Sequence, residues 1–312
     1  MNKGLSANIQ RLIIGLAATL LSSNVAAVSI TFDYRFDTSG FFTDINTGVA
    51  ITERRQALDL AASYYEGFTD SLTTIQSQNS NTWTVSFTNP GNVSQQVTLV
   101  DETINQDTIK IFVGGSNSYP GVLGFAGSGA ITASGTAEFT NSVLNRGQAS
   151  DDYGVWGGFA WFNAVHDWSF SSDVNDLTAS TPDFLTTAIH EIGHILGFGT
   201  ADSWFSNIEN GFFTGSNSIA SFGEAVPVDP FSSHWAEGTM STLDGLMQET
   251  LMDPSTSYGS RQLLTDLDYA GFADIGWQLT AVPLPASIWL FSAVIPLLRL
   301  RYNNLTLQND KQ

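Results

Sequence analysis

Two of the four histidines in this 312-residue chain, His190 and His194, lie four residues apart, and Glu191 directly follows the first. Residues four apart share one face of an α-helix, so both imidazoles can reach a single tetrahedral Zn²⁺ ion. A carboxylate beside them is positioned to take a proton from a zinc-bound water. The residue types and their spacing therefore predict a hydrolytic zinc site.

The residues around this motif predict a helix that can carry it. Thr181 is a good N-cap, Pro182 suits the first helical position, and Asp183 places negative charge at the positive end of the helix dipole. The side opposite the histidines collects the apolar residues Phe184, Leu185, Ala188, Ile189, Ile192, Ile195 and Leu196. One face is therefore expected to pack a core while the other presents the imidazoles. A helix with two solvated histidines would leave this division unexplained.

Zinc in a hydrolase usually keeps three protein ligands and one open position, so the motif needs a further ligand. After a sharp turn at Gly197 the next residue in reach is Thr200, which is not a histidine. Three candidates remain in the chain: Asp202, which is near but offset, His166 upstream in an aromatic stretch, and His234 after a loop long enough to return to the metal. The spacing alone leaves the choice open.

Three segments taken together resemble a metzincin metallopeptidase: His190-Glu-Ile-Gly-His194-Ile-Leu-Gly197, Ser-His234-Trp and Leu-Met252-Asp-Pro. The insertion before the third histidine is similar to that of leishmanolysin-type enzymes, and the first and last segments also resemble matrixins. The resemblance covers about residues 156–277. It implies an α+β, metzincin-like zincin fold, with a twisted mixed sheet, an active-site helix and a smaller C-terminal subdomain across a cleft.

The resemblance implies a role for each matching residue. His190, His194 and His234 would be the Zn²⁺ ligands, and Glu191 would be the general base and later the proton donor to the leaving amine. Met252 would form an apolar floor under the metal. The implied activity is that of a zinc metalloendopeptidase, a hydrolase whose substrate is a protein or peptide.

Other positions complete or limit the resemblance. Gly197 would permit the backbone to turn out of the helix, and residues 264–277 would form a closing C-terminal helix. Some metzincins use a tyrosine two residues after the methionine as an extra ligand, but this chain has Pro254 there, and Tyr258 is too far along to replace it. The chain has no cysteine, so a cysteine-based latency switch does not carry over.

Both ends of the chain carry sorting features. Residues 1–27 place Lys3 and Arg11 before an apolar run that ends in Val-Ala-Ala, which predicts a signal peptide, and residues 28–280 would be one catalytic domain. Residues 281–312 combine Val-Pro-Leu-Pro-Ala, an apolar stretch and two arginines, which predicts a transmembrane or sorting tail. That tail resembles a PEP-CTERM signal. The resemblance implies an exosortase-like processing enzyme and a secreted, surface-associated or membrane-anchored protein of a Gram-negative bacterium.

The composition limits the partners and ions. Thirty acidic against eleven basic residues give a net charge of −19, which argues against a nucleic-acid partner. An acidic exported protein leaves structural Ca²⁺ as a second candidate ion, although no segment has EF-hand spacing. Two alternatives to a peptidase stay open: a surface or matrix protein that keeps the fold with little activity, and a zinc hydrolase that acts on a non-peptide bond.

The remaining elements are expected from periodicity and turn residues. Strands are expected at 28–36, 81–88, 95–100 and 108–113, and a helix at 53–68 with Thr52 as its cap. The glycine-rich stretch 114–135 and the stretch 206–223 are expected to be loops. Residues 155–162 are expected to form a strand, which as an edge strand would line a substrate cleft.

Overall fold

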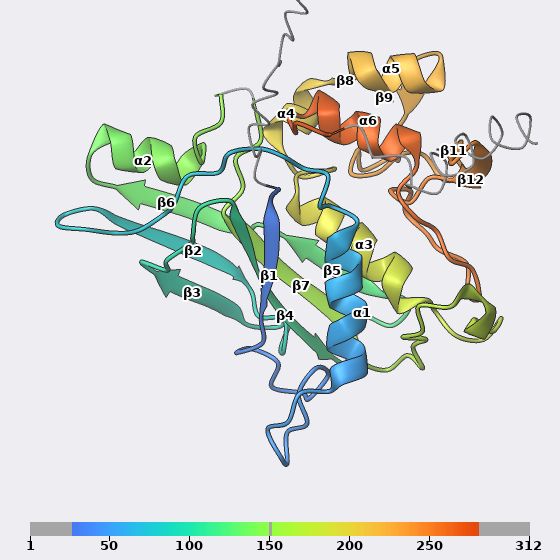
Figure 1. The fold of residues 1–312 in the computed structure, drawn as a ribbon, viewed down its shortest axis with the longest axis horizontal. Helices are drawn as coiled ribbons and strands as arrows, with labels where there is room; N and C mark the ends of the chain where they lie inside the picture. The colour runs from blue at the N-terminus through green and yellow to red at the C-terminus, as the bar shows by residue number, and fades with distance from the viewer. Residues whose placement is uncertain (1–26, 150–151, 281–312) are drawn as a thin grey trace, which may run out of the picture.

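The structure is a computed structural model that describes residues 27–149 and 152–280. The expected sorting tail at 281–312 lies outside these residues, as does the expected signal peptide at 1–27 except for its last residue. Within the two described ranges, no helix combines the length and the apolar character needed to cross a membrane. The described chain is a mixed α+β structure with several helices (Figure 1).

The elements follow one another with short connections. The strands are β1 (Ser29–Asp33), β2 (Thr82–Thr88), β3 (Gln96–Val100), β4 (Thr108–Ser116), β5 (Gly124–Gly127), β6 (Ala130–Ser134), β7 (Gly157–Asn163), β8 (Ile208–Glu209), β9 (Phe212–Phe213), β10 (Val226–Pro227), β11 (Met240–Leu243) and β12 (Leu246–Glu249). The helices are α1 (Thr52–Ser63), α2 (Ala137–Leu144), α3 (Phe184–Ile195), α4 (Asp202–Ser206), α5 (Ser216–Phe222) and α6 (Asp266–Asp274), with a 3₁₀ turn at Val174–Asp176.

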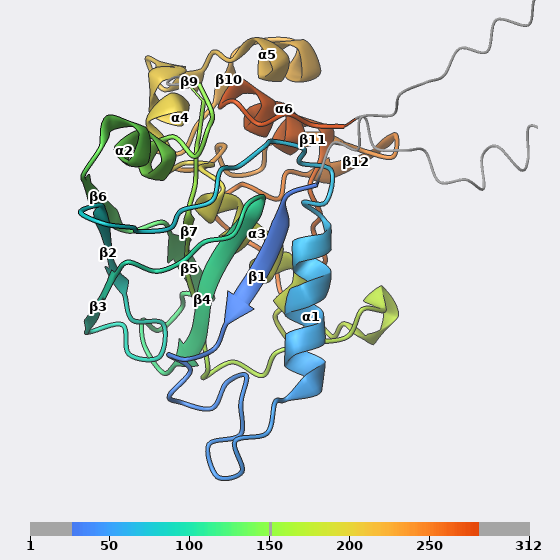
Figure 2. The ribbon, with the colours of Figure 1, turned by 60° about the vertical axis from the view of Figure 1, so that its left-hand side comes forward.

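The main sheet has the strand order β1-β4-β7-β5. Strands β1, β4 and β7 are parallel, and β5 runs antiparallel to β7, so the sheet is mixed. Figures 1 and 2 show α1 and α3 together on one face of this sheet and the smaller sheet β3-β2-β6 on the other side. The central strand β7 is buried along its whole length. Strands covered on both faces read as continuous apolar runs, which is why residues 157–163 show no polar alternation.

Successive side chains of the central strands point to opposite faces and fill two cores. On β4, Ile111 and Val113 contact the helix side, whereas Phe112 between them packs with Phe87 of β2 on the other side. On β7, Phe162 joins the helix-side core and Phe159 joins the second core. The two-residue period of the sheet therefore fixes α3 against one face while the small sheet covers the other.

The strand and helix predictions are confirmed in position for most elements, but three were wrong. The glycine-rich stretch is not a loop: β4 runs on to Ser116, and β5 and β6 lie within 124–134. Glycine weakens strand propensity, but pairing with β7 and β2 outweighs it here. The strand at 155–162 is not at the edge, because β5 occupies that place. The stretch 206–223 contains β8, β9 and α5 rather than loop alone.

Candidate metal centre

Helix α3 begins two residues later than the sequence predicts. Its N-cap is Asp183, whose carboxylate accepts hydrogen bonds from the Thr186 backbone N–H (3.3 Å) and Thr186 Oγ1 (2.7 Å). Thr181 and Pro182 therefore precede the helix, which corrects the predicted cap. Residue 183 has the stronger capping position because its carboxylate is buried and satisfies orphan donors at the helix start. The helix still carries the histidine motif at its C-terminal half.

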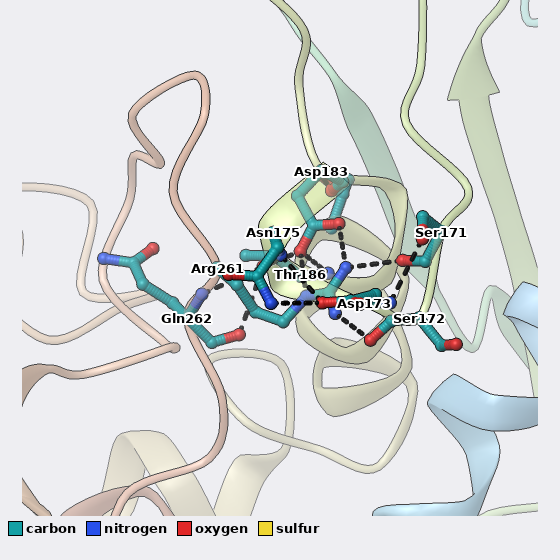
Figure 3. Close-up of polar contacts among 9 residues, drawn as sticks. Ser171, Ser172, Asp173, Asn175, Asp183, Thr186, Arg261 and Gln262 are labelled. Atoms are coloured by element: carbon teal, nitrogen blue, oxygen red, sulfur yellow. Dashed lines mark hydrogen bonds and ion pairs between the residues drawn. The ribbon is translucent and has the colours of Figure 1, made fainter. Parts of the chain in front are cut away.

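A buried ion pair fixes this helix start (Figure 3). Arg261 donates through Nε (2.8 Å) and Nη2 (2.8 Å) to the two oxygens of Asp183, a bidentate arrangement. The same guanidinium donates to the backbone carbonyls of Ser171 and Ser172, each at 2.7 Å. The pair therefore joins the segment before α3 to the segment that follows Met252, and it sets where the helix begins relative to both.

The structure brings together His190, His194 and His234. His190 Nε2 lies 3.0 Å from His194 Nε2, which in turn lies 3.1 Å from His234 Nε2. A tetrahedral site with Zn–N bonds of about 2.0–2.1 Å separates its ligand nitrogens by about 3.3 Å. The three nitrogens thus stand at nearly the separation that one ion requires, and they form a group that could hold a metal ion.

The hydrogen bonds of the rings show which nitrogens face the centre of this group. His190 Nδ1 lies 2.8 Å from the Leu251 carbonyl oxygen, and His194 Nδ1 lies 2.8 Å from the Phe198 carbonyl oxygen. A carbonyl only accepts, so each Nδ1 carries the hydrogen and each Nε2 carries a lone pair. Two lone pairs at 3.0 Å repel each other unless a cation lies between them. This donor set fits a metal ion and does not fit a hydrogen-bonded histidine pair.

The surroundings hold these imidazoles in the neutral form that binds metal. Burial, followed by the neighbouring His194 and His234, lowers the pKa of His190 well below its ordinary value. Burial and His234 lower the pKa of His194 to about 4. Burial also lowers the pKa of His234, although Asp229 opposes the shift. Metal ligands must be deprotonated, so at neutral pH all three rings are ready to coordinate.

Glu191 lies beside the histidines and is 5% exposed. Its Oε2 is buried without a hydrogen-bond partner, and burial raises the pKa of this carboxyl to about 8. Glu191 and the three histidines line one cleft of about 520 Å³, together with residues 121–126 and 253–256. A poorly solvated carboxyl at the wall of a cleft is the environment that tunes an acid or base toward neutral pH.

The free edge of the main sheet forms one wall of this cleft. Strand β5 pairs with β7 on one side only, and Gly124 to Ala126 of β5 line the cleft. A Cβ atom added at Gly124 would lie 2.9 Å from Glu191 Oε1, so any larger residue would press on the carboxylate. Glycine at this position therefore brings the strand edge and Glu191 next to each other.

Met252 lies under the helix that carries the first two histidines. It is fully buried, and a Cβ atom added at Gly193 of α3 would lie 2.8 Å from its sulfur. The Met252 carbonyl accepts a hydrogen bond from the Trp235 N–H (3.0 Å), which ties it to the residue after His234. Gly193 allows this close packing, and sequence reasoning missed it because a glycine inside a helix is ordinarily only a weak helix former.

Two further residues that the sequence did not single out support His234. Asp229 accepts hydrogen bonds from the N–H groups of Ser233 (2.7 Å) and His234 (3.0 Å), and its Oδ2 lies 3.8 Å from His234 Nδ1. Gly199 has φ of +69°, and a Cβ there would overlap the Ser233 carbonyl. An Asp five residues before a candidate ligand histidine is the only signal that the sequence offered for this support.

The remaining predicted residues separate clearly. Gly197 has φ of +100° and ends the helix turn, which places the Phe198 carbonyl against His194. His166 lies outside the histidine group and contacts Tyr258, with 3.3 Å between its Nδ1 and the Tyr258 hydroxyl. Asp202 begins α4 and is not part of the group. Among the candidates for a third ligand, only His234 lies with the other two.

Comparisons with protein-family models, with curated proteins and with solved structures give no match for this chain.

Proposed function

We propose that the chain is a zinc metalloendopeptidase with a metzincin-like fold. The observation that supports this most is the convergence of three histidine Nε2 atoms beside the unpaired carboxyl of Glu191 at the wall of one cleft. The mixed sheet, the helix that carries the motif and the methionine beneath it are what such a fold requires. Peptide hydrolysis is preferred over other hydrolyses because of the sequence resemblance.

His190, His194 and His234 would hold Zn²⁺, with their Nδ1 atoms engaged by Leu251 O, Phe198 O and the Ser233 hydroxyl at 3.1 Å. Such partners fix the ring orientations before the ion arrives. A Zn²⁺ ion held there supplies Lewis acidity, which polarises a carbonyl and makes water a better nucleophile at neutral pH.

Glu191 would move the proton. Its Oε2 has no partner within the protein, so it is available to accept a proton from water in the cleft and to deliver that proton to the leaving nitrogen. Its pKa near 8 without an ion shows a carboxyl that burial has made more basic. A cation beside it would lower that pKa and restore the ionised form that a base needs.

Strand β5 would orient the substrate. An extended peptide can add to a free strand edge through its backbone, so the side chains need not match for binding. The absence of a side chain at Gly124 would let the peptide backbone approach Glu191. We further propose export through residues 1–27, and an exosortase-like partner and membrane contact through residues 281–312.

The test compares zinc content and cleavage of casein or gelatin by the full chain and three variants. Glu191→Gln is expected to keep about one Zn²⁺ per chain and to lose activity about 10²- to 10⁴-fold. His234→Ala is expected to lose both metal and activity. His166→Ala is the matched control, since it removes the histidine that lies outside the group, and it is expected to keep both.

Two results would contradict the proposal. If the wild type binds zinc but cleaves no protein substrate, the chain is a zinc hydrolase of another bond or a surface protein that retains the fold. If His234→Ala keeps full metal and activity, the third ligand has been misassigned.

A further inference from the structure

A second group of ligand-type side chains lies next to the Met252 turn, apart from the histidines. Glu237 lies three residues after His234, Glu249 ends β12, and Asp253 directly follows Met252. Each offers a carboxylate oxygen, and these oxygens all lie within 4.8 Å of one another. Three carboxyl groups at this spacing repel one another strongly unless something positive or a proton lies between them.

No described basic side chain neutralises this acidic group. The ion pairs of residues 27–149 and 152–280 join other carboxylates, and none contains Glu237, Glu249 or Asp253. Arg261, the basic residue closest to them in sequence, is committed to Asp183 and two backbone carbonyls. The cluster therefore holds excess negative charge in the described part of the protein.

Two buried oxygen atoms beside the cluster have no donor. Asp253 is 1% exposed and its Oδ1 has no hydrogen-bond partner. Gln262 is 5% exposed, and its Oε1 also has none, while its Nε2 donates to Glu249 Oε2 at 3.0 Å. Because both atoms belong to one amide, the unpaired oxygen lies beside the Glu249 carboxylate. Buried acceptors are nearly always paired, so two orphans at one place indicate a missing positive ligand.

We propose that Glu237, Glu249 and Asp253, with the Gln262 amide beside them, form a Ca²⁺ site that is separate from the histidine group. Carboxylate and amide oxygens are the ligands of a hard cation, and the cluster contains no imidazole or thiolate that would select zinc. Oxygens at about 2.3–2.6 Å from Ca²⁺ lie up to about 5 Å apart, whereas the Mg²⁺ shell is only about 4 Å across. Oxygens spread within 4.8 Å fit the larger ion.

The alternative occupant of this space is a proton. Burial, with Glu249 and Glu237 beside it, raises the pKa of Asp253 to about 8, so without a cation this carboxyl would be protonated near neutral pH. A proton neutralises one charge but provides only one donor, which leaves the Gln262 oxygen unpaired. A cation supplies the charge for three carboxylates and can bind several oxygens at once.

A cation here would join the two segments that support the candidate zinc site. The Gly238 N–H donates weakly to Asp253 Oδ2 (3.4 Å), and the Trp235 N–H donates to the Met252 carbonyl (3.0 Å), so the loop after His234 and the Met252 turn already lie together. Glu237 belongs to the first segment and Asp253 to the second. Bound Ca²⁺ would stabilise this junction whether or not the histidine group is catalytic.

The test measures Ca²⁺ binding directly in the full, zinc-loaded chain. Equilibrium dialysis against Ca²⁺ up to about 10 mM covers the range of extracellular calcium sites. We expect one Ca²⁺ per chain, unchanged zinc content, and a Tm increase of about 5 °C when Ca²⁺ is one hundred times its Kd. Glu249→Gln and Asp253→Asn should weaken Ca²⁺ binding at least tenfold and abolish the Tm increase. Glu224→Gln, which alters an exposed glutamate elsewhere, is the matched control and should bind as the wild type does.

The proposal is overturned if the wild type binds no Ca²⁺ in this range, or if both variants bind it as the wild type does. It is also overturned if Asp253→Asn stabilises the chain without Ca²⁺ while the wild type binds none, because the group then shares a proton. Should Asp253→Asn fail to fold, Glu237→Gln decides the matter, since that side chain is exposed and its loss should still weaken binding. None of these readouts depends on peptidase activity.

Discussion

Asp268 is expected to hold the third histidine segment, the Met252 turn and α6 in one arrangement. It is fully buried, and its two oxygens accept five hydrogen bonds, from Trp235 Nε1 (3.1 Å), Leu251 N (3.0 Å), Met252 N (3.3 Å), Thr265 N (2.8 Å) and Thr265 Oγ1 (2.8 Å). The Leu251 carbonyl in turn orients His190. Substitution of this carboxylate should therefore weaken both the fold and the metal site.

Asp268→Asn replaces one oxygen with an NH₂ group that faces N–H donors, so at least two of the five bonds are lost. Hydrogen bonds to charged groups contribute about 1.5–3 kcal/mol each, which gives a loss of about 3–6 kcal/mol. Burial raises the pKa of Asp268, so the charged form already carries a cost that the amide avoids, and the lower end, about 3 kcal/mol, is expected. Loss of such an outer partner should also weaken zinc binding about tenfold.

Urea unfolding of the metal-free chain measures the first effect, and competition with a chromophoric chelator measures the second. Asp266→Asn is the control, because this exposed acid lies in the same helical turn and bonds only Thr242 Oγ1 among the described residues. It should cost less than about 1 kcal/mol and leave zinc affinity unchanged. If Asp268→Asn behaves like this control in both assays, the five contacts do not organise the site and the reasoning is refuted.

Two further predictions concern other buried carboxylates. Arg261→Met should lower the free energy of unfolding by about 3–5 kcal/mol in urea titrations, because it leaves Asp183 buried without its cation; a loss below about 1 kcal/mol would show that the capping bonds from Thr186 suffice. Burial raises the pKa of Asp70 from 3.8 to about 6 in the folded chain, so the folded state holds this proton more tightly and its stabilisation is lost as the pH rises from about 4 to 6. Asp70→Asn, which keeps an acceptor for the Gln278 N–H (3.0 Å), should therefore be more stable than the wild type at pH 7.5, by up to about 3 kcal/mol, and should lose that advantage near pH 4; equal stability at both pH values would contradict the assigned shift.

The chemistry of the candidate site could be predicted because its main signal is local. His190, Glu191 and His194 lie within one and a half helical turns, so helix geometry alone places them together. His234 follows 40 residues later, and its approach depends on Gly199 meeting Ser233 and on bonds to Asp229. No periodicity encodes such long-range contacts, which is why the residues alone left three candidates and only the resemblance selected one.

Local preference also misplaced two features of the fold. The sequence offered Thr181-Pro182 as a helix start, which is a good local signal, but the ion pair between Asp183 and Arg261 gives the cap to a residue whose partner lies 78 positions away. The glycines of 114–135 suggested a loop, although sheet pairing makes them strands and brings Gly124 against Glu191. In both cases tertiary contacts outweigh propensities worth only about 1 kcal/mol.

The net charge of −19 suggested an acidic surface, but part of that charge lies inside the protein. Six aspartates are less than one-tenth exposed: Asp37, Asp70, Asp183, Asp229, Asp253 and Asp268. Five of them accept bonds that join segments or close tight turns, as Asp70 does for residue 278 across 208 positions. A chain without disulfides can fix long connections in this way, because a carboxylate accepts several N–H groups at once. Asp253 is the exception with an unpaired oxygen, and that contrast is what identifies its cluster as a site for an ion.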